Sequence, residues 1–108
     1  MVEHDYMKVI SVLAKSFKAS REPDVVASHE GHDIFEVAFH SIEGDIKYKV
    51  YYFGKHNMDI IIGKGVFKSI KFEKWLSNVE YDLEQAFHKN VKLESQTGIT
   101  DYRIKLTM

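Results

Sequence analysis

The sequence contains no cysteine, so it can form no disulfide and offers no thiol for catalysis or zinc binding. It has no apolar run near the roughly 20 residues that a membrane-spanning helix needs. Its first ten residues, MVEHDYMKVI, carry acids where a secretory signal requires a basic region. These absences lead us to expect a soluble, cytoplasmic protein without a membrane segment.

Arginine is scarce, occurring only as Arg21 and Arg103, and the formal net charge is −1. General nucleic-acid binding usually needs a surplus of basic charge, which this chain lacks. The charge is nevertheless uneven, because residues 44–75 contain seven lysines against three acidic residues, while 1–43 contain four basic and eight acidic ones. We therefore expect a local basic patch in the middle of the chain.

The 108 residues, 44% hydrophobic and 29% charged, are enough for one globular domain spanning 1–108 and too few for two. Apolar residues recur at intervals of three and four over 4–19 and about 69–89, which predicts two amphipathic helices. A period of two predicts the strands, at 25–28, 33–43, 46–53, 58–62, 91–95 and 101–107.

The expected fold class is α+β, in the order α-β-β-β-β-α-β-β. An N-terminal helix precedes a four-stranded antiparallel meander, a second helix lies on the same sheet face, and a C-terminal strand pair follows.

Alternation along the second and third strands assigns each side chain to a face. The face expected to pack against the helices carries Phe35, Val37, Phe39, Tyr48, Val50 and Tyr52. A tight turn at Glu43-Gly44 would pair Phe35 with Tyr52, and a turn at Gly44-Asp45 would shift the pairing by two residues. Both registers keep the same side chains on the same face.

The segment SHEGHD, residues 28–33, places two of the six histidines beside a glycine. It falls between two expected strands, where a hairpin turn is needed and where Gly31 can supply a positive φ. If Glu30-Gly31 forms the loop, His29 and His32 become a directly opposed pair, close enough to share a metal ion. Structural zinc sites normally have four ligands. We therefore interpret the segment as a turn, keep His29 and His32 as a weak metal candidate, and expect no cofactor.

Residues 61–69, IIGKGVFKS, run from an apolar strand through a glycine-rich turn to the expected start of the second helix. The context resembles a phosphate-binding loop, but the spacing is GxGxxKS where the motif requires GxxxxGK[ST], and the sheet is expected to be antiparallel. Nucleotide hydrolysis is therefore not expected. Lys64, Lys68 and Ser69 are candidates for binding an anion at the helix start. The alternative is a plain turn with exposed lysines.

The sheet face opposite the helices is the main functional candidate. By alternation it carries four apolar residues, Ile34, Ile42, Phe53 and Ile61. The polar and aromatic residues on the same face are Glu36, Lys47, Lys49 and Tyr51. A contiguous exposed apolar patch usually marks a partner or dimer interface. We therefore expect a protein-interaction or regulatory module without catalytic activity, self-associating as a homodimer through this face.

Two other functions stay open. A nucleic-acid-binding module could use phosphate contacts and base stacking by Lys47, Lys49, Tyr51, Lys55 and Lys64. A weak metal-binding or metal-dependent protein could use His29 and His32. Catalysis has little support, because no serine lies in a nucleophile elbow and no HExxH occurs.

No sequence motif identifies a family. The order of elements, a helix before a strand meander and a second helix, broadly resembles secretion-chaperone-like folds. The C-terminal helix that such folds often carry is absent from this pattern. The resemblance concerns topology alone, so it implies no activity and transfers no functional residue.

Overall fold

The structure is a computed structural model that describes residues 5–28, 33–41, 44–54 and 57–108. Its elements are, in chain order, α1 (Asp5–Ser16), β1 (Asp24–Ala27), β2 (Ile34–Ser41), β3 (Gly44–Gly54), β4 (Asn57–Gly63), the 3-10 turn η1 (Lys64–Val66), α2 (Phe72–Phe87), β5 (Lys92–Thr97) and β6 (Asp101–Thr107). This order confirms the α+β architecture expected from the sequence.

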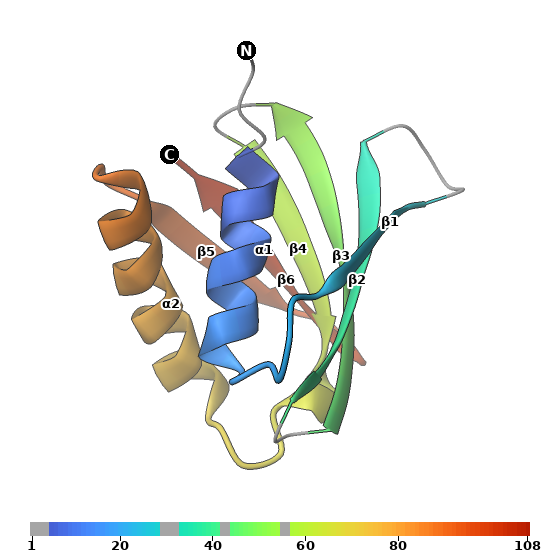
Figure 1. Ribbon diagram of the computed structural model, residues 1–108. Helices are drawn as coiled ribbons and strands as arrows, with labels where there is room; N and C mark the ends of the chain where they lie inside the picture. Colours follow the sequence, from blue (N-terminus) through green and yellow to red (C-terminus); the bar gives the residue numbers. More distant parts are fainter. Residues whose placement is uncertain (1–4, 29–32, 42–43, 55–56) are drawn as a thin grey trace.

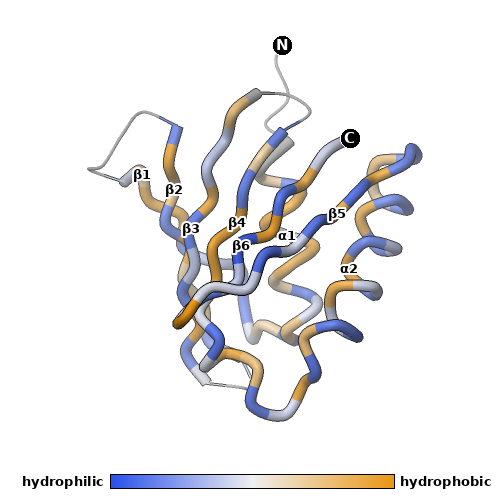
Figure 2. The backbone as a smooth tube through the Cα atoms, turned by 180° about the vertical axis from the view of Figure 1, so that it is seen from behind, coloured by the Kyte–Doolittle hydropathy of each residue, from blue (hydrophilic) through white to orange (hydrophobic). Residues whose placement is uncertain are grey.

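The six strands form one sheet in the order β1-β2-β3-β4-β6-β5, and each neighbouring pair is antiparallel. Both helices cover the same face (Figure 1), which we call the inner face. Figure 2 views the sheet from the opposite side, the outer face, where no described helix lies over the strands. The sheet has two edges, β1 and β5.

The core lies between the inner face and the two helices. The strands contribute alternate apolar residues, among them Val37, Val50 and Ile60, each at most 1% exposed. Phe17 follows α1 and stacks on Trp75 of α2, with ring centroids 5.1 Å apart. Trp75 also donates its indole N–H to the Ser16 hydroxyl at 2.9 Å. The two helices are therefore joined by ring stacking and one hydrogen bond beside the sheet.

The predicted faces of β2 and β3 are confirmed where the pairing is regular, but neither predicted register is found. The pairing differs by two residues from that of a Glu43-Gly44 turn and by four from that of a Gly44-Asp45 turn. Phe35 pairs with Val50, not with Tyr52, and Ser41 pairs with Gly44. Gly44 has a φ of +104° and is the first residue of β3, so it is not inside the turn as expected. A shift of two residues leaves every side chain on its predicted face, because alternation has a period of two.

Helix α2 is shorter than predicted and begins at Phe72, with Lys71 at its N-cap. Phe67 explains the difference, because its half-buried ring packs against Phe72 and Trp75 at centroid distances of 5.2 and 5.0 Å. The packing of Phe67 against the core therefore sets the path of the chain before α2, and the helix begins only after it. At the other end, His88 adopts a left-handed conformation (φ 56°) and donates its N–H to the Glu84 carbonyl, which terminates the helix.

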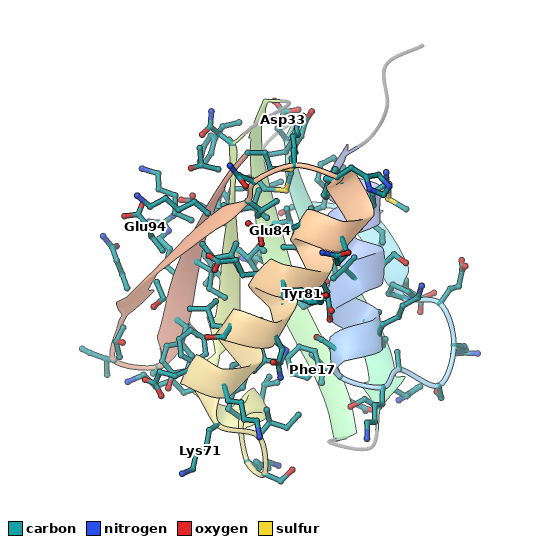
Figure 3. The ribbon with its side chains drawn as sticks, turned by 90° about the vertical axis from the view of Figure 1, so that its left-hand side faces the viewer. Phe17, Asp33, Lys71, Tyr81, Glu84 and Glu94 are labelled. Atoms are coloured by element: carbon teal, nitrogen blue, oxygen red, sulfur yellow. The ribbon has the colours of Figure 1, made fainter. Side chains whose placement is uncertain are left out.

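The apolar periodicity of the second helix predicts that Glu80 and Glu84 face water, but in the structure both lie against β5. Glu80 accepts a hydrogen bond from the Leu93 N–H at 3.0 Å, and Glu84 accepts one from the Val91 N–H at 3.3 Å. Both side chains are half-buried. Figure 3 shows Glu84 on the side of α2 that faces the strands. The correction has a physical cause: an edge strand presents backbone N–H groups that need acceptors, and α2 supplies them.

Candidate interaction face

The strand register builds an ordered outer face from residues far apart in the sequence. One row crosses the whole sheet through successive pairs: Val26, Glu36, Lys49, Ile61, Arg103 and Gln96. A second row passes through Ile34, Tyr51, Asp59, Lys105 and Glu94. Oppositely charged residues are neighbours in both rows, as with Glu36 beside Lys49 and Asp59 beside Lys105.

An open hollow of about 780 Å³ lies over this face. Its side-chain lining includes Asp24, Val26, Glu36, Lys47, Lys49, Tyr51, Ile61 and Asp101. Five of the eight residues predicted as the interaction surface are in this lining: Glu36, Lys47, Lys49, Tyr51 and Ile61. Ile34 is outside the lining but pairs directly with Tyr51.

The apolar patch predicted for this face is smaller than expected. Phe53 is 65% exposed, whereas Ile34 and Ile61 are only half-buried side chains rather than open ones. Ile61 lies between Lys49 and Arg103, whose aliphatic stems can cover part of it. Ile42 falls outside the described residues.

A charged cluster lies on the outer face of β3, β4 and β6. Arg103 places Nε 3.3 Å from Asp59 Oδ2, and its guanidinium lies 5.9 Å from the centre of the Tyr51 ring. The Asp59 side chain is 13% exposed, and its Oδ1 has no hydrogen-bond partner among the described residues. These contacts position Arg103 next to Ile61, which lines the hollow. The outer face therefore carries a third cationic side chain in addition to Lys47 and Lys49.

The three anion-binding candidates lie before α2 and not at its start, so their expected position at the helix start is corrected, whereas anion binding by them stays a prediction. Lys64 lies in η1, and its ammonium is 5.7 Å from the centre of the Tyr102 ring. Lys68 and Ser69 are exposed in the segment before Lys71, and the free N–H groups of α2 begin only after them. The GxGxxKS segment thus forms a connection shaped by packing of Phe67.

The metal-binding and nucleic-acid-binding candidates lie partly in the hollow and partly outside the residues that the structure describes. His29 and His32, the weak metal pair, lie outside the described residues, as does Lys55. Within the described ranges, no group of three or more His, Asp or Glu side chains is arranged to hold a metal ion. Of the nucleic-acid candidates, Lys47, Lys49 and Tyr51 share the hollow, whereas Lys64 lies against Tyr102.

Sequence reasoning missed several residues of this face. Val26 lies in the predicted strand 25–28 and Asp24 just before it, and the predicted meander already placed this strand beside β2, so the signal for both residues was present in the sequence. Asp101 reaches the hollow only because β6 pairs with β4. The same pairing of β6 with β4 places Arg103 on the outer face beside Ile61. Val26 is notable because it is 61% exposed, nearly as much as Phe53.

Comparison with family models, curated proteins and solved structures gave no match for this chain. No helix formed by the described residues has the length and apolar character to cross a membrane.

Proposed function

We propose that this protein is a small protein-interaction module without catalytic activity, and that its partner contacts the outer face of the sheet. The observation that carries the proposal is the open hollow, in which acidic, basic, aromatic and aliphatic side chains lie together. Asp24, Glu36 and Asp101 accompany Lys47 and Lys49 in its lining. Such mixed chemistry suits a protein surface, which carries both signs of charge and apolar groups.

The same lining gives less support to nucleic acid. Phosphate binding depends on several clustered cations, and the acids beside Lys47 and Lys49 would repel a polyanion. A nucleic-acid function using Lys47, Lys49 and Tyr51 is therefore the second proposal. It predicts an affinity that falls steeply with salt and is weakened by Lys47→Glu combined with Lys49→Glu.

A capture experiment separates the two proposals. The wild-type chain, Ile61→Asp and Tyr81→Asp are each immobilised and exposed to lysate of the native host, with and without nuclease treatment. Tyr81 is the control, because it is 61% exposed on α2, which covers the inner face of the sheet (Figure 1). We expect a protein retained by the wild type and by Tyr81→Asp, lost on Ile61→Asp, and insensitive to nuclease.

Two results would contradict the proposal. Equal retention by Ile61→Asp and wild type would show that the outer face does not carry the contact. Loss of the retained protein after nuclease treatment would favour the nucleic-acid function instead.

Self-association through the outer face is the form of contact predicted from the sequence. Burying one large apolar side chain contributes roughly 1.5–3 kcal/mol, so Phe53→Asp should weaken a dimer that uses this face without unfolding the domain. Sedimentation equilibrium measures the effect. A wild-type chain that stays monomeric at high concentration would exclude self-association. A cytoplasmic location remains part of this proposal.

A further inference from the structure

The two edges of the sheet are protected to different degrees. An unprotected edge strand presents unpaired N–H and C=O groups and is a template for pairing with another strand. At the β5 edge, the outward N–H groups of Val91 and Leu93 are taken by Glu84 and Glu80 of α2. The beginning of β5 is therefore closed to a further strand.

The β1 edge has no such cover among the described residues. Ser28 donates its N–H to the Ile34 carbonyl at 2.8 Å, so the even-numbered residues of this segment bond to β2. Because bonding directions alternate along an antiparallel strand, the N–H and C=O groups of Val25 and Ala27 point away from the sheet. Figure 1 shows no helix or strand beyond β1 on that side.

Side chains at this edge suit a second strand. Val26 is 61% exposed on the outer face, and Ala27 is small and exposed. Asp24 is the one charged residue within β1. An exposed valine on an uncovered edge strand is the kind of feature that natural edge strands usually avoid.

We propose that two copies of this chain join through their β1 strands, antiparallel, to form one continuous sheet. The outward backbone groups set the register. Val25 pairs with Ala27 of the partner subunit, so that Val26 lies on the two-fold axis and faces Val26 of the partner subunit. Asp24 then lies opposite Ser28 of the partner subunit, which keeps the two Asp24 carboxylates apart.

The difference between the two edges explains why the strand added to β1 is β1 of a second copy and not β5. A sheet with two open edges could add copies head to tail without limit, because β1 of one copy would meet β5 of the next. The glutamates on β5 oppose that contact. Pairing of β1 with β1 uses the same strand on both copies, so it closes with two-fold symmetry after one addition.

This inference goes beyond the proposed function, because it concerns backbone groups at an edge and leaves the hollow open. In the dimer, the two outer faces become neighbours on one side of the extended sheet. The edge contact shares Asp24 and Val26 with the lining of the hollow, but Ile61 lines the hollow from β4, with two strands between β4 and β1. Failure of the partner contact is therefore read from Ile61→Asp in the capture experiment, and failure of the edge contact from Ala27→Pro in sedimentation.

Disulfide trapping tests the register directly, because the native chain contains no cysteine. Val26→Cys would place two thiols in a directly opposed pair whose Cα atoms are roughly 4.5 Å apart, within the range that a disulfide spans. Phe53→Cys is the control for exposure, because the two native side chains are exposed to a similar degree, 61% and 65%. Under mild oxidation we expect a covalent dimer from Val26→Cys and at least tenfold less from Phe53→Cys. Equal trapping, or trapping by Phe53→Cys alone, would overturn the register.

Sedimentation equilibrium of two proline variants tests the edge itself. Proline removes an N–H and is tolerated on an edge strand where that N–H faces outward. Ala27→Pro should raise the dimer dissociation constant at least tenfold, whereas Ser95→Pro, at an outward position of β5, should leave it unchanged. Circular dichroism confirms that each variant is folded. A monomeric wild-type chain, or a dimer that survives Ala27→Pro but dissociates in Phe53→Asp, would overturn the edge contact.

Discussion

The two faces of this sheet are built from adjacent residues of the same strands, yet they differ in burial and in chemical character. In β4, Ile60 points into the core and is 1% exposed, whereas Ile61 points outward, is half-buried and lines the hollow. The inner face is uniformly apolar and covered by two helices. The outer face mixes charges with a few apolar side chains. The comparison indicates that the contacts that stabilise the fold are concentrated on the inner face.

The largest expected difference is between two phenylalanines. Phe17 is fully buried against Phe39, Phe67 and Trp75, whereas Phe53 is 65% exposed in the irregular step of β3 between Tyr52 and Gly54. Phe17→Ala should lower the free energy of unfolding by about 3–5 kcal/mol. Phe53→Ala should change it by less than about 0.5 kcal/mol. Urea denaturation measures both free energies of unfolding. A comparable loss in the two variants would contradict the predicted difference between the buried and the exposed phenylalanine.

Removing the acceptor at the β5 edge should have an intermediate effect. Glu80→Ala leaves the Leu93 N–H without its partner, so the free energy of unfolding should fall by about 1–3 kcal/mol. Glu80→Gln keeps an acceptor oxygen and should lose less. Gln85→Ala, an exposed change on the same helix, is the control and should stay within about 0.5 kcal/mol of wild type. Chemical denaturation of the three variants measures whether the hydrogen bond from Leu93 to Glu80 stabilises the fold. Equal stability of Glu80→Ala and Gln85→Ala would show that it does not.

Tyr48 should show the opposite sign. Its side chain is buried on the inner face, and its hydroxyl has no hydrogen-bond partner among the described residues. Replacing an unpaired buried polar group by an apolar one of similar shape removes a desolvation cost. Tyr48→Phe should therefore raise the free energy of unfolding by about 1 kcal/mol. A loss of stability in this variant would show that the hydroxyl is paired in solution.

The same residue predicts a dependence on pH. Burial raises the pKa of the Tyr48 hydroxyl above its usual value of 10. Above pH 10 the unfolded chain therefore loses a proton that the folded protein keeps, and the free energy of unfolding falls as pH rises. Tyr48→Phe should reduce this slope, by up to about 1.4 kcal/mol per pH unit. Equal slopes for wild type and variant in denaturation above pH 10 would contradict the prediction.

The smallest effect is expected on the outer face. The Arg103 side chain is 49% exposed and that of Asp59 is 13% exposed. Because the guanidinium lies at the open side of the pair, water can take its place beside the carboxylate, and the ion pair then contributes little. Arg103→Ala should change the free energy of unfolding by less than about 1 kcal/mol, and less still at high salt. Thermal unfolding at low and high ionic strength checks this. A large, salt-independent loss would place Arg103 among the residues that hold the fold.

The sequence was sufficient to predict the faces, because alternation is local and independent of the exact turn. It could not set the register, because Gly44 uses its positive φ at the first residue of β3 and not within the turn where the sequence placed it. The roles of Glu80 and Glu84 also escaped prediction. Their hydrogen-bond partners belong to another element, and only the packing of α2 beside β5 brings them together.

The hollow was predicted in part for a similar reason. Alternation places Glu36, Lys49 and Ile61 on one face of consecutive strands. Asp24 joins them through β1, which the predicted meander already placed beside β2, whereas Asp101 joins them only because β6 lies beside β4. The pairing of β6 with β4 depends on contacts between distant segments, which a local pattern does not contain.

The most direct test of the division between the faces is the difference in unfolding free energy between Ile60→Ala and Ile61→Ala, measured by urea denaturation under one set of conditions. The two changes delete the same atoms from adjacent residues of one strand. We predict a loss of about 2–5 kcal/mol for Ile60→Ala and about 1 kcal/mol or less for Ile61→Ala. Equal losses would show that the outer face is part of the stabilising core and would contradict the account.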